Sequence, residues 1–401
     1  MPKANHAFTH AFTGILYQRR GYHSVLSTAI GCGRPQKAGK QKPDTPLFFC
    51  SHRSSNLTSP ILGVWRTTIV TIMQAPTTLN NQGRNNMVQI FRALAIIAVV
   101  MIHTTPLGNW QVLCRPFINF SVATFLFLSG YLTKIENDNW HAFYKKRIIR
   151  VLVPYVIWTI LYTLASRHLG NLPVNLLTAK AAAPMYYIFV YIQFVLLTPL
   201  LGRLAMSKYR FLGWFFAPVS VLIFKYYWLL TGQALNPHFS LIWSDACLGW
   251  FTFYYLGLVL GNRIIDRQYS LKMLLVLYFV SILIQIAEGY WWLSLGEVNC
   301  GTQIKLSSFL TSSLFLLIAF TILKDGRYDV KNRFLRILGD YSFGIYLCHI
   351  MVMNLLSGFV PYFKSIPYPI TSVIIILISL GCCYIGDRIC GDKLSHWLGL
   401  R

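Results

Sequence analysis

The sequence is poor in charged residues, and acidic residues are especially scarce. Of its 401 residues 12% are charged and only 12 are Asp or Glu, whereas about a quarter of an ordinary soluble domain is charged. Because 55% of the residues are hydrophobic, the chain cannot shelter its apolar side chains from water in one core. Apolar runs near the roughly 20 residues that cross a ~30 Å hydrocarbon layer recur from residue 88 onward. The sequence predicts a polytopic integral membrane protein.

Motifs for metal binding and for a disulfide framework are also lacking. The nine cysteines contain no CxxC pair, and most lie inside apolar runs, where Cys behaves as a small hydrophobic residue. We therefore expect no metal site and no bound cofactor. Cys114 and Cys300 fall in loops that we assign to the same side of the membrane, so a disulfide between them is compatible with the sequence.

The few acids leave a formal net charge of +24, which would suit a nucleic-acid-binding protein. After residue 73, however, the Lys and Arg residues fall mainly in short loops between apolar runs, where membrane proteins carry their topology signals. We therefore expect membrane lipid as a partner and no nucleic acid.

The N-terminal 72 residues show no periodic pattern and hold nine Lys or Arg against one acid, Asp44. Two interpretations remain open: a disordered basic leader, or a mis-assigned start with Met73 or Met87 as the true first residue, which we favour. Residues 73–87 are then a cytoplasmic N-terminal segment, 88–390 a membrane domain, and 391–401 a cytoplasmic tail.

Ten apolar runs separated by charged or Gly/Pro breaks make up the membrane domain. They cover residues 88–108, 117–133, 151–167, 184–202, 211–230, 242–261, 271–293, 306–323, 335–357 and 367–386. Helices are expected because backbone polar groups in lipid must be satisfied within the segment, and the runs are too long for barrel strands. The predicted fold class is an all-α bundle of about ten transmembrane helices.

The loops between these runs differ sharply in charge. The even-numbered loops carry sixteen Lys or Arg and the odd-numbered loops carry five. Under the positive-inside rule this places both termini in the cytoplasm, which agrees with an even number of spans.

The first span carries two residues that are costly in lipid, Arg92 near its start and His103 near its end. Eleven helical positions come to three turns plus about 20°, so the two share one face about 16 Å apart along the axis. A fixed positive charge and a group that moves protons near neutral pH thus lie on one face. The alternative is that Arg92 extends to the headgroups and His103 sits at the opposite interface, each merely tolerated.

Two other spans hold polar side chains among apolar neighbours. Ser129 and Gly130 interrupt the second span with small residues, which permits close helix contact, and packing alone could explain them. Near the C-terminus, Tyr346 and His349 lie three positions apart on one helix face.

Before the third span, Arg147 and Arg150 form an i, i+3 pair. Paired guanidinium groups are suited to phosphate recognition. They could equally be a topology signal lying on anionic lipid, and the sequence does not decide between the two.

Taken together, these segments resemble the membrane-bound acyltransferase-3 family, bacterial polytopic enzymes that O-acylate glycans. The family's Arg-x10-His element corresponds to Arg92 and His103, and the Phe-x-Phe-x-Ser-Gly, Arg-x-x-Arg and Tyr-Ser-Phe-Gly-Ile-Tyr-Leu-x-His elements follow in the family's order. Residues 100–105 resemble the surface-polysaccharide O-acetyltransferases of this family. One departure is that Val88, Gln89 and Ile90 stand where the family often has an acid before the Arg.

The resemblance implies an O-acyltransferase, expected to be an O-acetyltransferase, of the bacterial cytoplasmic (inner) membrane. Its donor substrate would be acetyl-CoA or another acyl-CoA, and its acceptor a cell-surface or lipid-linked polysaccharide such as O-antigen. The expected catalytic residues are His103 as base and Arg92 as orienting or stabilising charge. Expected substrate-binding residues are Arg147, Arg150, Ser129, Tyr346 and His349.

Three other functions are compatible with a ten-span protein. Intramembrane His and Arg also mark transporters of small solutes or glycan intermediates, but the two halves of the chain show no matching elements. A lipid-linked sugar transferase would want outer-loop carboxylates, and only Glu288 and Glu297 qualify. A catalytically inactive accessory subunit is favoured only by the missing acid before Arg92.

Overall fold

The computed structural model describes residues 85–232, 247–267, 269–326 and 330–401, and every regular element in these ranges is a helix. The longer α-helices are α3 (Asn86–Thr104), α5 (Phe120–Tyr131), α6 (Trp140–Ala165), α8 (Tyr186–Met206), α13 (Leu271–Ser294), α14 (Leu306–Asp325), α16 (Ser342–Phe359) and α17 (Ile370–Leu398). The shorter ones are α4 (Asn109–Cys114), α7 (Leu172–Thr178), α9 (Phe216–Val221), α10 (Tyr227–Thr231), α12 (Phe251–Gly261) and α15 (Arg333–Asp340).

Single turns of 3₁₀- or π-helix join several of these helices. They are η2 (Arg115–Phe117), η3 (Leu169–Asn171), η4 (Ala183–Met185), η5 (Arg210–Trp214), η6 (Leu222–Tyr226), η7 (Cys247–Trp250) and η8 (Phe363–Ser365). Residues 1–72 lie outside the described residues, and so do the two interpretations of them, a basic leader or a later start. Part of the sixth expected span also lies outside.

Eight helical segments are long and apolar enough to cross a membrane. Two shorter apolar segments, Phe216–Thr231 and Cys247–Gly261, coincide with the fifth and sixth expected spans. The expected all-helical, polytopic membrane fold is confirmed. The second span differs in detail, because a 3₁₀ turn containing Pro116 separates α4 from α5 where one run was expected to begin.

The outward face of α13 is apolar, as expected for a helix that contacts lipid. Val276, Phe279 and Leu283 are 63%, 61% and 67% exposed and follow one another at helical spacing along one face. Polar residues of the same helix, such as Ser281 and Gln285, are instead buried against the protein. A helix with apolar residues outside and polar residues inside is suited to lipid surroundings.

Helices α5 and α12 pack with their backbones in direct contact. A Cβ on Gly257 would lie 2.1 Å from the carbonyl oxygen of Phe127, and one on Gly130 would lie 2.2 Å from that of Tyr254. Gly261 makes the same kind of approach to Tyr131. Small residues thus let the two helices approach closely, as expected for the Ser129-Gly130 break.

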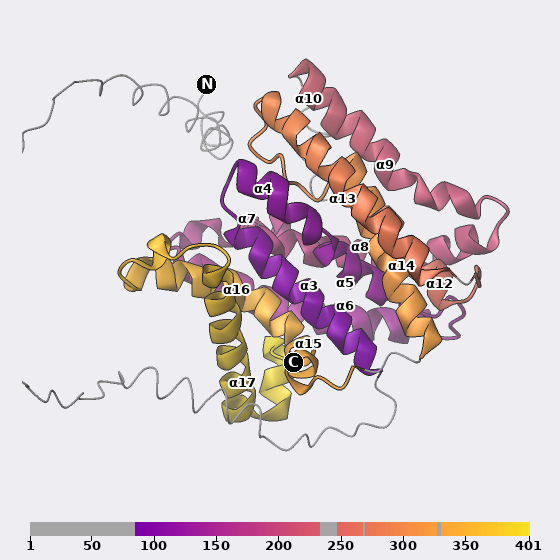
Figure 1. Ribbon diagram of the computed structural model, residues 1–401. Helices are drawn as coiled ribbons and strands as arrows, with labels where there is room; N and C mark the ends of the chain where they lie inside the picture. The colour runs from indigo at the N-terminus through magenta and orange to yellow at the C-terminus, as the bar shows by residue number, and fades with distance from the viewer. Residues whose placement is uncertain (1–84, 233–246, 268, 327–329) are drawn as a thin grey trace, which may run out of the picture. The chain divides into compact units, whose positions relative to one another are not determined.

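Helix α3 contacts α5, α14 and α15 as well as α16 and α17, which lie on its left in Figure 1. Asn85 caps its start by accepting a hydrogen bond from the Met87 backbone N–H at 2.9 Å. At its other end, the Thr104 and Ser372 hydroxyl groups are 2.7 Å apart and join it to α17. The helix that carries Arg92 and His103 is therefore enclosed by protein for most of its length.

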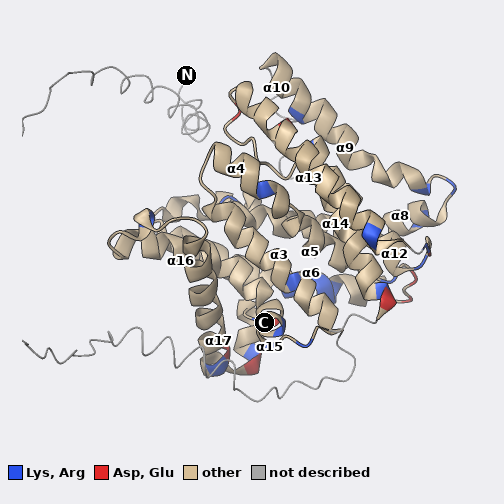
Figure 2. Ribbon diagram, viewed as in Figure 1, with Lys and Arg blue, Asp and Glu red and all other residues tan. Residues whose placement is uncertain are grey.

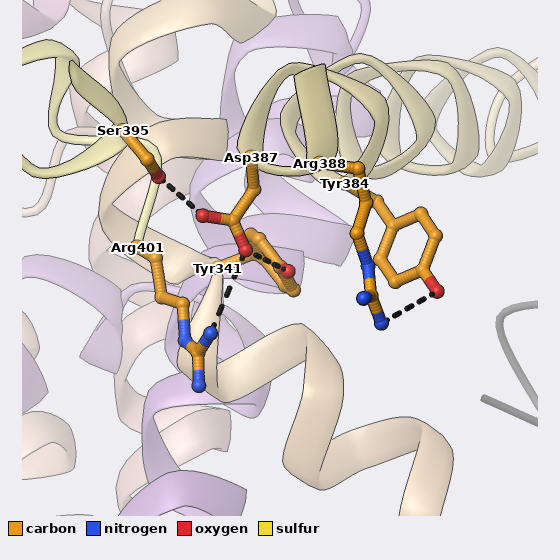
Figure 3. Close-up of polar contacts among 6 residues, drawn as sticks. All are labelled: Tyr341, Tyr384, Asp387, Arg388, Ser395 and Arg401. Carbon is orange, nitrogen blue, oxygen red and sulfur yellow. Dashed lines mark hydrogen bonds and ion pairs between the residues drawn. The ribbon is translucent and has the colours of Figure 1, made fainter. Parts of the chain in front are cut away.

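The last ten residues fold back on the bundle (Figure 3). Helix α17 breaks at Gly391, whose φ of 69° suits glycine. Beyond the break, Ser395 donates to Asp387, which also accepts a hydrogen bond from Tyr341 at 2.7 Å and pairs with Arg401 at 3.6 Å. Residues 391–401, expected as a tail, are thus ordered against the start of α16; their cytoplasmic location stays a prediction.

Gly344, in the Tyr-Ser-Phe-Gly element, leaves the space that this fold-back needs. A Cβ there would lie 2.5 Å from the carbonyl oxygen of Leu400, a buried residue. The Trp158 indole N–H of α6 donates to the carbonyl of Leu398 at 3.0 Å, so α6 also holds the returning segment. The fold-back fixes the start of the helix that carries Tyr346 and His349.

The α5–α12 contact predicts a clear effect on stability. Gly257→Ala places a methyl group against a backbone carbonyl that cannot move alone, so the free energy of unfolding should fall by about 1–3 kcal/mol, the usual cost of overpacking. The measurement is apparent melting temperature in detergent. Gly358→Ala, at an exposed α16 position with nothing within 4 Å, is the control, and equal melting temperatures for the two variants would contradict the contact.

Candidate active site between α3 and α16

The face of α3 that carries Arg92 and His103 is turned toward protein. The His103 ring lies 5.2 Å from the His349 ring of α16, centroid to centroid. Three turns earlier, Arg92 interacts electrostatically with Tyr187 of α8. Both side chains are partly buried. The helical periodicity that places these two residues on one face therefore also directs both of them into the bundle.

His349 is held in one orientation by its own helix. The ring is 1% exposed, and its Nδ1 lies 3.1 Å from the carbonyl oxygen of Ile345 and 2.8 Å from that of Tyr346. Carbonyl oxygens only accept, so Nδ1 carries a proton and the neutral ring has its lone pair on Nε2. This Nε2 is buried and has no hydrogen-bond partner in the described part of the chain. An unpaired buried acceptor is costly and suits a site that receives a proton or a donor group.

His103 complements this arrangement. Its ring nitrogens make no hydrogen bond to any residue in the described ranges, and the two rings are inclined at 48°. Because imidazole changes charge close to neutral pH in water, two imidazoles side by side with unused nitrogens form a site able to take up and release a proton.

Tyr346 lies beside this pair, as its spacing from His349 predicts. The two ring centroids are 6.2 Å apart, and the Tyr346 hydroxyl donates to the carbonyl of Pro184 before α8. The Tyr187 ring packs on it at 5.5 Å. Tyr346 thus connects α16 to α8. Its ring lies between His349 and Tyr187, the residue that interacts with Arg92.

Ser129 is not brought into this group by any contact. Its Oγ is buried and has no hydrogen-bond partner among the described residues. The serine lies in the α5 turn that packs against α12. Its expected role in substrate binding stays a prediction.

Arg147 and Arg150 diverge, although they are one turn apart. Arg147 turns toward the protein: it donates to the Leu132 carbonyl at 3.4 Å and lies over the Phe143 ring at 4.8 Å. It also interacts electrostatically with Tyr254 of α12. Arg150 is exposed. Figure 2 shows Lys and Arg colour concentrated at the end of the bundle where α3 begins, around α6, α12 and α15.

Arg115 is a site neighbour that sequence reasoning missed. It follows α4, donates to the Ile102 carbonyl at 3.0 Å, and interacts electrostatically with His103. One signal could have found it: Arg115 is among only five cations on the nearly uncharged set of loops. Cys114 beside it and Cys300 are both free cysteines, so the compatible disulfide is not formed in the structure.

The all-helical bundle of long apolar helices, with two imidazoles side by side between α3 and α16, defines a polytopic membrane protein. Residues 85–388 match the acyltransferase domain of the acyltransferase-3 family. The chain therefore belongs to this family, as its motifs indicated, and is a multi-pass membrane acyltransferase. Its membership favours the enzyme over the transporter alternative. No curated protein and no solved structure matches the chain.

The contacts of His349 predict its tautomer. In ¹⁵N-histidine-labelled protein in bilayers near pH 7, the His349 ring should show a protonated Nδ1 and an unprotonated Nε2, because two carbonyls face Nδ1. The resonance is assigned by its loss in His349→Gln. An unprotonated Nδ1 would contradict the hydrogen bonds to Ile345 and Tyr346.

Proposed function

We propose that the chain is an O-acyltransferase, and in the first instance an O-acetyltransferase, of the bacterial cytoplasmic membrane. It moves an acyl group from cytoplasmic acyl-CoA to a hydroxyl of a cell-surface or lipid-linked polysaccharide. The observation that carries this proposal is the His103–His349 ring pair at one end of α3, with Arg92 at the other end of the same helix face. Family membership supports acyl transfer. The geometry supports separate roles for the two ends of α3, with the donor oriented near Arg92 and the proton taken up at His103.

The donor is proposed to bind at the basic end of the bundle. The phosphates of acyl-CoA are anionic, and charge-assisted hydrogen bonds from guanidinium groups are the strong, specific way to hold them. Arg150 is exposed at this end, and Arg147 lies one turn before it. If this end faces the cytoplasm, as the loop charges predict, acyl-CoA meets these residues directly.

Between this end and α3 lies a row of tyrosines that suits the extended arm of the donor. Arg147 interacts electrostatically with Tyr254, which interacts in turn with Tyr191. The Tyr191 ring stacks near Tyr187 at 6.4 Å, and Tyr187 interacts with Arg92. We infer that the pantetheine arm follows these side chains, so that its thioester reaches the region between Arg92 and the histidines.

The proposed chemistry is a nucleophilic displacement at the thioester carbonyl. The acceptor hydroxyl oxygen forms a bond to the carbonyl carbon while His103 takes the hydroxyl proton, and the carbon–sulfur bond then breaks. The departing thiolate of CoA takes up a proton, so the products are an ester and free CoA thiol. His349, with its lone pair on Nε2, is placed to orient His103 or to share the proton. Tyr346 positions His349's helix, and Arg92 orients the donor or stabilises negative charge that develops on the carbonyl oxygen.

The acceptor is proposed to approach from the opposite side of the membrane. His103 lies in the last turn of α3, at the end away from the basic loops. A polysaccharide carried on a lipid or exposed at the outer surface would reach this end without crossing the bilayer. The acyl group, not the glycan, would then move across the protein.

Removal of the two α3 side chains should abolish acyl transfer. His103→Ala should lower kcat by about 10²–10⁴-fold, the usual contribution of a positioned base, and Arg92→Ala should remove donor orientation. Acylated glycan is measured by mass spectrometry of cell-surface material, together with the amount of protein in the membrane. His141→Ala, an exposed histidine on α6, is the control, and wild-type acylation in either variant would remove that residue from the mechanism.

The basic end should control donor affinity. In an Arg147→Ala, Arg150→Ala double variant, KM for acyl-CoA should rise by about 10-fold or more with a smaller change in kcat, because lost phosphate contacts weaken binding of substrate and transition state alike. Arg267→Ala with Lys272→Ala removes two exposed cations from another loop and serves as control. An unchanged KM in the first double variant would leave Arg147 and Arg150 as topology signals only.

A further inference from the structure

A group of polar side chains lies around residues 300–305 and reaches the end of α3 through Arg115, which donates to the Ile102 carbonyl. It comprises four buried residues, Gln111 of α4, Asn119, Gln285 of α13 and Lys305 before α14, and the half-buried Arg115. We refer to these five residues as the polar cluster. Figure 2 shows Lys or Arg colour beside α4, apart from the basic loops at the other end of the bundle.

The three amides of the polar cluster are each only half satisfied. Gln111 accepts from the Gly301 N–H at 3.3 Å, Asn119 donates to the Gly301 carbonyl at 3.2 Å, and Gln285 donates to Ser308 at 2.8 Å. The other ends, Gln111 Nε2, Asn119 Oδ1 and Gln285 Oε1, are buried without partners in the described residues. The three residues are 0%, 1% and 0% exposed. Unfilled donors and acceptors this deeply buried call for a polar ligand or water.

Lys305 adds a positive charge that no carboxylate neutralises directly. It is 1% exposed, and its Nζ donates to the carbonyls of Gln285 at 3.3 Å and Cys300 at 3.0 Å. Burial lowers the pKa of Lys305 to about 8, so it is still largely protonated at pH 7. Glu288 attracts it electrostatically, but the Glu288 oxygens already accept hydrogen bonds from Tyr226 and Ser307.

Arg115 is the second cation, and it connects the cluster to the histidines. Its guanidinium donates once, to the Ile102 carbonyl, and its Nε is buried without a partner. In the described part of the chain no carboxylate lies within 4 Å of it. It interacts electrostatically with both Lys305 and His103. With Glu288 counted, the region keeps one uncompensated positive charge beside the proposed base.

We infer that the polar cluster binds an anionic group of the acceptor saccharide, a sugar carboxylate or a phosphate, next to the hydroxyl that is acylated. This inference rests on the proposed function and adds the chemical class of the acceptor. Arg115 and Lys305 would hold the anion, and the free amide groups would pair with neighbouring hydroxyls. A purely structural role, fastening residues 300–305, accounts for the bonds that are made and not for the donors and acceptors left open.

The test compares three sugars that differ at one carbon: methyl glucoside, methyl glucuronide and methyl glucoside 6-phosphate. Binding to the full-length protein in nanodiscs is measured by saturation-transfer NMR and competition. The wild type should bind one or both charged sugars about 10-fold or more tightly than the neutral one, as charge-assisted hydrogen bonds predict. The stronger of the two identifies carboxylate or phosphate as the group bound.

Arg115→Gln and Lys305→Gln should each reduce this preference by about 10-fold, while Arg115→Lys should keep part of it. Lys364→Gln removes an exposed cation after α16 and should leave the preference unchanged. Thermal unfolding is measured for every variant. Arg115→Gln is the most informative, because the only hydrogen bond that the Arg115 side chain makes in the described residues goes to Ile102, although its Cδ packs on Gly301. No preference in the wild type, or an equal preference in Arg115→Gln, would overturn the inference.

A donor-side assay separates this inference from the proposed function. In the proposed mechanism, release of CoA from acetyl-CoA depends on His103, and with methyl glucoside present the acetyl group can pass to a neutral sugar hydroxyl or to water, so no charged acceptor is required. Loss of charge preference with intact, His103-dependent CoA release supports the polar cluster as the anion site. Intact CoA release without any charge preference would refute only the anion site at the polar cluster. Absence of CoA release from the wild type would refute the proposed acyltransferase function itself.

Discussion

A charged or titratable side chain on a membrane helix must be sheltered from hydrocarbon, and the arrangement of this protein depends on how α3 meets that requirement. On the polar face of α3, His103 lies beside His349 of α16, and Arg92 interacts electrostatically with Tyr187 of α8. Because the cost of exposing these groups to lipid is several kcal/mol by most measures, α3 has little freedom to rotate. The position of the surrounding helices follows from the need to cover this face.

Close backbone contacts hold those surrounding helices in place. Without a hydrophobic driving force between helices in lipid, dense packing has to supply much of the association energy. Gly257 lets α12 meet α5, and Gly344 admits the carbonyl of Leu400. The Asp387 contacts with Tyr341 and Arg401 hold the returning C-terminal segment on α16. His349 is thus positioned by contacts that lie well away from it.

Local spacing in the sequence was sufficient to predict the helices, the shared face of Arg92 and His103, and that of Tyr346 and His349. It could not predict that His103 faces His349, because hydrophobic periodicity gives no pairing between helices so far apart in the chain. It also suggested that Arg147 and Arg150 act together, whereas Arg147 folds onto Phe143 and Arg150 points outward. Arg147 turns inward because the Leu132 carbonyl at the end of α5 accepts its hydrogen bond, and a local sequence pattern cannot predict the position of that carbonyl.

The two ends of α3 therefore present different electrostatic environments. At the start of the helix, many exposed cations can hold a soluble polyanion and release it, since screened surface charges bind weakly one by one. At its end lie the half-buried Arg115 and the buried Lys305, and because these two cations are less exposed to water, each would have a larger effect on a bound anion. In the proposed function the donor and the acceptor approach from opposite ends of α3, and this asymmetry would attract each substrate to its own end of the polar face.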